Sequence, residues 1–160
     1  KKVTTPLTEM DAPVLACQDM VIVPILRAGM GLVDRPLSVM PDAIVAHIGL
    51  ARDEQTHVAH EYLVKMPHKM PADRQFLIVD PMLATGGSAM HATDVLIARG
   101  VDLSKIILMV LVAAPEGVRA FHTKYPDVPI YTAALDSHLN EKAYIVPGLG
   151  DAGDRIFGTL

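Results

Sequence analysis

The stretch FLIVDPMLATGGSA, residues 76–89, places an acid and a glycine-rich turn directly after an apolar run. The apolar run predicts a buried strand of a parallel sheet. Such a strand would deliver Asp80 to its carboxyl end, at the edge where open α/β sheets bind ligands. A loop over residues 81–87 would then lead to a helix that begins near Ser88. We therefore expect a ligand site on this loop.

The composition of the loop indicates phosphate as the ligand. The backbone N–H groups of residues 85–88 can surround an anion because two of these residues are glycines, and the helix N-terminus adds a favourable dipole. A P-loop would need Gly-Lys-Ser/Thr, whereas Ser88 follows Gly87 directly. The stretch favours binding of a phosphomonoester over hydrolysis of a nucleoside triphosphate. A glycine-rich turn with a purely structural role is the alternative.

Two further loops have residues suited to binding. In VPILRAGMG, Arg27 follows an apolar run and precedes two glycines, so that it could hold a second phosphate group. A surface ion pair is the alternative for this arginine. In YIVPGLGDAGDRIFGT, proline and glycines predict a turned backbone whose amides and carbonyls can meet a flat polar ligand. Asp151 and Asp154 lie in this tail without the spacing of an EF-hand, and a solvated turn is the alternative there.

The composition limits the classes of protein to consider. A chain of 160 residues suits one domain, and none of its apolar runs approaches the roughly 18 to 20 residues of a membrane span. The net charge is −4 and the basic residues are scattered, which argues against nucleic acid as a partner. The single Cys17 excludes an internal disulfide and suits a reducing compartment. We expect a soluble, cytoplasmic protein.

Short aliphatic runs predict the elements that must position these loops. Alternation of such runs with helical segments is typical of a parallel sheet covered on both faces. The charged segment between two apolar arms at 46–65 predicts a protruding antiparallel hairpin, and Pro36 predicts a kink or an early helix end. The expected strands are 20–26, 43–50, 76–79, 106–112 and 128–133, and the expected helices are 88–99 and 116–125.

Five segments together resemble uracil phosphoribosyltransferase, which has the type I phosphoribosyltransferase fold. They are VPILRAGMG, IVDPMLATGGSA, LVAAPEG, YPDVPIYTAALD and LNEKAYIVPGLGDAGDRIFGT, and they extend over nearly the whole chain. Pro81 follows Asp80 where other type I relatives usually carry a second acid. The resemblance implies a mostly parallel sheet flanked by helices, with a β-hairpin arm and a C-terminal hood. Residues 1–160 would form a single phosphoribosyltransferase domain that lacks the family's N-terminal helical segment.

The resemblance also implies a reaction: transfer of the phosphoribosyl group of 5-phosphoribosyl 1-pyrophosphate (PRPP) to N1 of uracil, giving UMP and pyrophosphate. Asp80 would hold the ribose and its developing charge, and Arg27 and Arg52 would stabilise the departing pyrophosphate. Mg²⁺ would be held by PRPP and by water near Asp80, without direct protein ligands. PRPP would contact Arg27, Arg52, Asp80, Pro81, Met82, Leu83, Ala84, Thr85, Gly86, Gly87, Ser88 and Asp151. Uracil would contact Ile145, Gly150, Asp151 and Ala152.

Partners and rival functions complete the expectations. By resemblance the protein would form a homo-oligomer through its hairpin arm, and GTP is a possible allosteric activator. One rival is a non-catalytic binding or regulatory domain, like those attached to some uridine kinases. A second rival is a transferase for another base, against which the pyrimidine-type tail argues.

Overall fold

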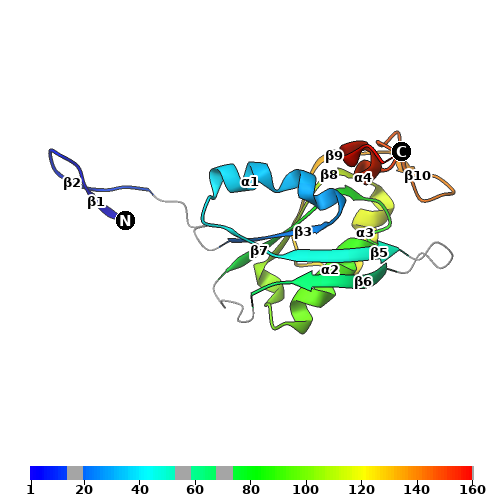
Figure 1. Cartoon of the computed structure of the whole chain (residues 1–160), viewed down its shortest axis with the longest axis horizontal. Helices are drawn as coiled ribbons and strands as arrows, with labels where there is room; N and C mark the ends of the chain where they lie inside the picture. Colours follow the sequence, from blue (N-terminus) through cyan, green and yellow to red (C-terminus); the bar gives the residue numbers. More distant parts are fainter. Residues whose placement is uncertain (14–19, 53–58, 68–73, 160) are drawn as a thin grey trace.

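The computed structural model describes residues 1–13, 20–52, 59–67 and 74–159, together with the backbone but not the side chains of Arg52 and Ala59. A seven-stranded sheet forms its centre, in the order β6-β5-β3-β7-β8-β9, with β4 also paired to β3 (Figure 1). All pairs are parallel except β5 with β6. The strands are β3 (Met20–Leu26), β4 (Ile44–Val45), β5 (His47–Arg52), β6 (Ala59–Lys65), β7 (Gln75–Leu83), β8 (Ile106–Ala113) and β9 (Ile130–Leu135).

Helices cover both faces of the sheet, which confirms the predicted fold class. Alternate residues of β3 face opposite sides of the sheet. Val21 and Val23 pack in the core cluster that contains residues of the helices at 87–98 and 115–124, whereas Ile22 packs in the cluster that contains the helix at 34–39. This burial on both faces explains why the strand is a continuous apolar run. The helices are η1 (Ala28–Leu32), α1 (Asp34–Val39), α2 (Gly87–Ala98), η2 (Leu103–Lys105), α3 (Pro115–Lys124) and α4 (Ala152–Phe157).

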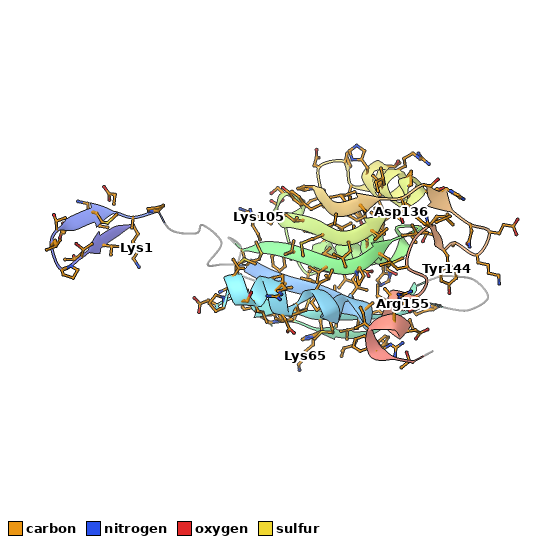
Figure 2. The ribbon with its side chains drawn as sticks, turned by 90° about the horizontal axis from the view of Figure 1, so that it is seen from above. Lys1, Lys65, Lys105, Asp136, Tyr144 and Arg155 are labelled. Carbon is orange, nitrogen blue, oxygen red and sulfur yellow. The ribbon has the colours of Figure 1, made fainter. Side chains whose placement is uncertain are left out.

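Smaller elements lie at the two ends of the chain. β1 (Lys2–Thr4) and β2 (Glu9–Asp11) form an exposed antiparallel hairpin. β10 (His138–Leu139) and β11 (Ile145–Val146) form a second one, which together with α4 makes the C-terminal hood. Figure 2 shows Asp136, Tyr144 and Arg155 at one end of the sheet and Lys105 at the other. The segments predicted to bind ligands therefore gather at the carboxyl ends of the parallel strands.

The predicted hairpin arm is confirmed. β5 and β6 pair antiparallel, with a register irregularity between Gly49 and Leu50. The tip of the arm, residues 53–58, lies outside the described residues. None of the helices formed by the described residues has the length and apolar character needed to cross a membrane.

Strand β7 is longer than predicted. It runs to Leu83, so that Asp80 lies inside the strand rather than at its end, and the predicted loop of residues 81–87 shrinks to 84–86. The reason is tertiary: β8 continues to pair with β7 as far as Leu83, whereas β3 stops pairing at Val79. Pro81 is tolerated because this part of the strand has lost its neighbour on the β3 side and needs no N–H there.

The prediction that the helix would be kinked or would end early at Pro36 is also wrong. Helix α1 begins at Asp34 and continues past Pro36 to Val39, with the Met40 N–H donating to the Pro36 carbonyl. Pro36 is the third helical residue, and the first N–H groups of a helix have no intrahelical acceptor. The missing N–H of the proline therefore removes no hydrogen bond.

Candidate functional site

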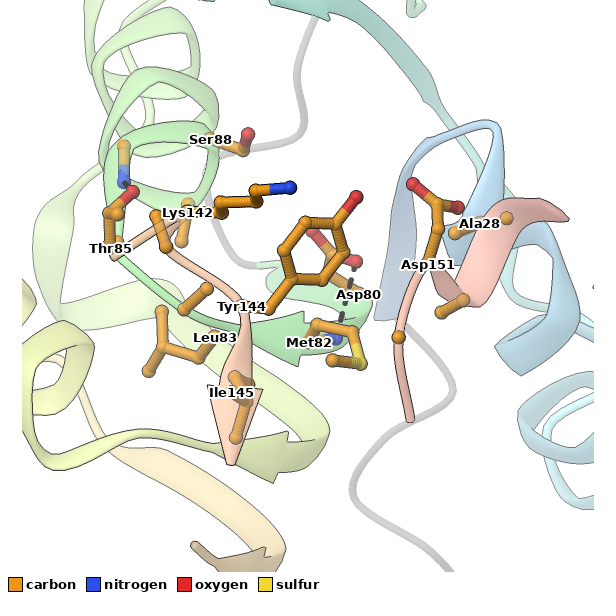
Figure 3. Close-up of a pocket in the computed structure, with 18 of the residues that line it drawn as sticks. Ala28, Asp80, Met82, Leu83, Thr85, Ser88, Lys142, Tyr144, Ile145 and Asp151 are labelled. Atoms are coloured by element: carbon orange, nitrogen blue, oxygen red, sulfur yellow. Dashed lines mark hydrogen bonds between the residues drawn. The ribbon is translucent and has the colours of Figure 1, made fainter. Parts of the chain in front are cut away.

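A cavity of about 690 Å³ opens at the carboxyl edge of the sheet (Figure 3). Three chain segments form most of its wall: the turn after β7 and, more than fifty residues later, the loop between β10 and β11 and the start of α4. Its lining residues are Ala28, Asp80, Met82, Leu83, Ala84, Thr85, Gly86, Gly87, Ser88, Ala89, Glu141, Lys142, Ala143, Tyr144, Ile145, Gly150, Asp151, Ala152 and Gly153.

The turn between β7 and α2 leaves backbone donors for an anion. Gly86 has φ +85°, in the left-handed region where a residue with a Cβ would be strained, and it precedes α2 without a side-chain cap among the described residues. Thr85 Oγ1 accepts a hydrogen bond from the Gly87 N–H at 3.4 Å. The remaining N–H groups of the first helical turn face the cavity end of the helix, where the dipole favours negative charge.

The N-terminus of α3 supports this turn from below. Gly117 is buried, and a Cβ placed on it would lie 2.3 Å from the Ala84 carbonyl oxygen and 2.8 Å from that of Leu83. Only glycine allows two backbones to approach so closely. The position of the turn is therefore set by helix α3 as well as by its own glycines.

Asp80 belongs to β7 and lines the cavity, as do Tyr144 and Asp151 (Figure 3). Asp80 is partly buried, and its Oδ1 accepts a weak hydrogen bond from the Met82 N–H at 3.4 Å. The carboxylate is thus held by the strand beside the turn that offers backbone donors. This arrangement can place a negative charge next to a sugar whose phosphate is bound by the turn.

Asp151 is the N-cap of α4. Its Oδ1 accepts a hydrogen bond from the Asp154 N–H at 2.9 Å, while the side chain lines the cavity. Upstream, the Gly148 N–H donates to Asp136 Oδ2 at 2.9 Å, and Gly148 and Gly150 have φ of +56° and +70°. The tail therefore has the turned, glycine-dependent backbone that its sequence predicts.

The loop of residues 140–144, which we call the hood loop, is the part of the wall that sequence analysis missed. Asn140 Oδ1 accepts hydrogen bonds from the N–H groups of Lys142 and Tyr144 at 3.0 and 2.9 Å. Ala143 has φ +60°, unusual for a residue with a Cβ. Asparagine favours such turns, so Asn140 was the one local signal available, and it did not reveal that Glu141, Lys142 and Tyr144 face a cavity.

Glu116 ties the hood to helix α3. Its Oε1 accepts a hydrogen bond from the Leu139 N–H at 3.1 Å. Donation by its own N–H and by that of Leu139 holds the pKa of the Glu116 carboxyl below its ordinary value. The carboxylate is therefore ionised at neutral pH, and it anchors the strand that leads into the hood loop.

The two predicted arginines do not line this cavity among the described side chains. Arg27 lies at its rim, next to Ala28, and its Nη2 is 3.2 Å from Asp154 Oδ1. Arg52 ends β5 on the arm, and its side chain lies outside the described part of the chain. Pro81 is buried and is not among the lining residues. The other predicted residues, Asp80, Met82 to Ser88, Ile145, Gly150, Asp151 and Ala152, meet in one wall.

The cavity offers oxygen ligands to a cation but no closed metal cage. Within the described ranges, no group of three or more His, Cys, Asp or Glu side chains is arranged to hold a metal ion. Asp80 and Asp151 both face the cavity, and carboxylate oxygens are the protein ligands that Mg²⁺ prefers. These residues fit an ion that arrives with phosphate oxygens and keeps part of its water.

Comparisons with known proteins agree on one family. The family model described as uracil phosphoribosyltransferase matches residues 1–159. A curated protein from Rhodospirillum centenum with that name is 59% identical over 157 residues, which are 98% of this chain and 72% of the relative. The protein of the same name from Burkholderia vietnamiensis is 56% identical over 159 residues, 99% of this chain and 72% of the relative.

Solved structures agree with the fold. The AQ2163 protein from Aquifex aeolicus superimposes with a TM-score of 0.90 at 36% identity, covering 98% of this chain and 74% of that one. The purine phosphoribosyltransferase from Pyrococcus horikoshii gives a TM-score of 0.58 at 17% identity, covering 75% and 72% of the two chains. At that identity the second likeness concerns the fold alone.

Proposed function

Because the chain belongs to the uracil phosphoribosyltransferase family, and so transfers the phosphoribosyl group of PRPP to uracil to give UMP and pyrophosphate, we propose how its cavity divides these substrates. The turn Ala84–Ser88 binds the 5′-phosphate, Asp80 lies against the ribose, and the tail frames uracil. The observation that carries the proposal is the single cavity wall that joins the turn to the tail across Asp80.

The reaction explains why these groups should face one another. Uracil N1 displaces pyrophosphate at the anomeric carbon, so positive charge develops on the sugar and negative charge on the leaving group. The Asp80 carboxylate stabilises the first, and the guanidinium groups of Arg27 and Arg52 stabilise the second. The 5′-phosphate turn holds the donor still while the tail holds the acceptor, which lowers the entropic part of the barrier.

The tail reads uracil through its backbone. Backbone groups of Ile145, Gly150 and Ala152 supply donors and acceptors that match the alternating edge of uracil, and Asp151 lies between this edge and the ribose. Ile145 is buried and lines the cavity. Cytosine has an exocyclic amine where uracil has a carbonyl oxygen. A backbone N–H of the tail that donates to this oxygen in uracil would have no acceptor in cytosine.

Lys142 adds a positive charge that the sequence did not indicate. Figure 3 shows its side chain extending from the hood loop into the cavity, and it is the one lysine or arginine among the described lining residues, against the acids Asp80, Glu141 and Asp151. PRPP and UMP are both strongly anionic. We propose that Lys142 attracts the 5′-phosphate from the side opposite the backbone turn.

Mg²⁺ is proposed as the cofactor. When bound, it would neutralise negative charge on the diphosphate. Asp80 and Asp151 are the residues that would hold it through water. The chain's own contribution is to keep these two carboxylates at the wall, Asp80 by its place in β7 and Asp151 by capping α4.

The arm is proposed as a contact between copies of the chain. β6 is an edge strand, and it exposes Tyr62 at 57% and Leu63 at 39%. Exposed apolar side chains on an unpaired edge favour association with another surface. Activation by GTP and a cytoplasmic location stay predictions of the sequence resemblance.

Two substitutions test the division of the cavity. Asp80→Asn should preserve the thermal unfolding midpoint and slow formation of UMP by about 100-fold or more, because the charge beside the sugar is lost. Asp151→Asn should keep the helix cap, since asparagine and aspartate cap equally well, and weaken substrate use. The assay is uracil-dependent release of pyrophosphate from PRPP. Near-normal rates in Asp80→Asn would remove Asp80 from the mechanism. Absence of uracil-dependent release of pyrophosphate with the unsubstituted protein would favour a non-catalytic domain.

A further inference from the structure

The guanidinium of Arg27 is held by the C-terminal helix rather than by its own loop. Its Nη2 lies 3.2 Å from Asp154 Oδ1, and its Cζ lies 5.7 Å from the ring centroid of Phe157. The Arg27 side chain is 57% exposed, so most of its surface is still open to solvent at the rim of the cavity. Arg27 is predicted to bind pyrophosphate, and the orientation of its guanidinium therefore depends on residues more than a hundred positions away in the sequence.

Asp154 is itself fixed in place. Its Oδ1 accepts a hydrogen bond from Thr159 Oγ1 at 2.5 Å, and its N–H donates to Asp151 Oδ1 at 2.9 Å. The side chain is 32% exposed, less than that of Arg27. The same helical turn thus carries Asp151, which lines the cavity, and Asp154, which holds Arg27.

Close packing joins α4 to the segment after Arg27. A Cβ placed on Gly31 would lie 3.1 Å from Ile156 Cδ1, and one placed on Gly153 would lie 3.8 Å from both Ala28 Cβ and Arg27 Nη2. Helix α4 therefore packs directly against Arg27 and the residues that follow it.

The ion pair leaves most of the guanidinium available. One nitrogen contacts one carboxylate oxygen, whereas the guanidinium has five N–H donors arranged to hold a phosphate by two parallel bonds. Asp154 restrains the group without using the donors that a diphosphate needs. A bidentate pair would have competed with the substrate instead.

We propose that Asp154 is a positioning residue, which orients Arg27 toward the pyrophosphate of PRPP. This inference rests on the proposed role of Arg27 as a pyrophosphate ligand. An exposed ion pair contributes little to stability, so its effect should appear in the use of PRPP rather than in unfolding.

A double-mutant cycle tests the inference. Asp154→Ala should raise KM for PRPP about twofold to fivefold and weaken product inhibition by pyrophosphate to the same extent, the fold-change that corresponds to an exposed ion pair. The value of kcat and the KM for uracil should stay within about twofold of the parent. Arg27→Ala should have a larger effect, and adding Asp154→Ala to it should change nothing further, because Asp154 acts through Arg27.

Two controls separate the possible results. Asp94→Ala breaks the exposed ion pair with Lys124, 2.7 Å long, between α2 and α3, and should leave KM for PRPP unchanged. Asp154→Asn keeps the shape of the side chain and replaces Asp154→Ala if that variant does not fold. An unchanged KM in Asp154→Ala, or a further rise when it is added to Arg27→Ala, would overturn the inference. Normal use of PRPP by Arg27→Ala alone would instead refute the proposed role of Arg27, and the inference with it.

Discussion

Substitution of Gly117 by alanine should damage PRPP binding, although Gly117 is not among the residues that line the cavity. The new Cβ would lie 2.3 Å from the carbonyl oxygen of Ala84, which is backbone of the phosphate turn and has no flexible end to move aside. The contact must open to at least 3.0 Å, a shift of about 0.7 Å in the turn or in α3. Overpacking of this kind costs about 1–3 kcal/mol of stability.

The kinetic effect follows from the displacement. A misplacement of about 1 Å in a positioning element can cost about 100-fold in rate, so we expect kcat/KM for PRPP to fall about 10- to 100-fold in Gly117→Ala. The assay is the initial rate of UMP formation against PRPP concentration at saturating uracil. Urea unfolding of the same preparation gives the loss in stability separately.

Gly100→Ala is the matched control. Gly100 follows Arg99, the C-cap of α2, with φ +85°, so alanine there is strained by about 1–2 kcal/mol, yet its Cβ would meet no heavy atom of the described residues within 4 Å. This variant should lose comparable stability and keep its kcat/KM for PRPP. The reasoning is refuted if Gly117→Ala retains kcat/KM within twofold, or if Gly100→Ala loses as much.

Three further predictions concern charge and backbone strain. Lys142→Ala should weaken binding of UMP in calorimetry, most at low salt, while the affinity for pyrophosphate stays constant. Ala143→Gly should raise the free energy of unfolding by up to about 1 kcal/mol with activity retained, because glycine accepts φ +60° without strain. Burial raises the pKa of Asp94, but hydrogen bonds from Lys124 and Tyr125 outweigh it and bring the pKa below its ordinary value. Asp94→Asn should therefore lower the unfolding midpoint at neutral pH, and the difference from the parent should shrink as pH falls through the folded-state pKa of the carboxyl.

The sequence by itself determined the features that depend on local composition. Continuous apolar runs such as that of β3 required a sheet covered on both faces, and the glycines after Leu83 required a turn that could bind an anion. The turned tail around Gly148 and Gly150 was equally evident, because proline and glycine restrict or release the backbone wherever they occur. These signals act over a few residues, so they can be read without knowing the fold.

Only the tertiary structure decided how these pieces meet. The pairing of β7 with β8 moved Asp80 into the strand, and the packing of α3 placed Gly117 against the turn between β7 and α2. The hood loop brought Lys142 to the cavity, and α4 brought Asp154 to Arg27. Each of these contacts joins segments far apart in the chain, and their distances depend on how whole layers pack, which no short stretch of sequence encodes.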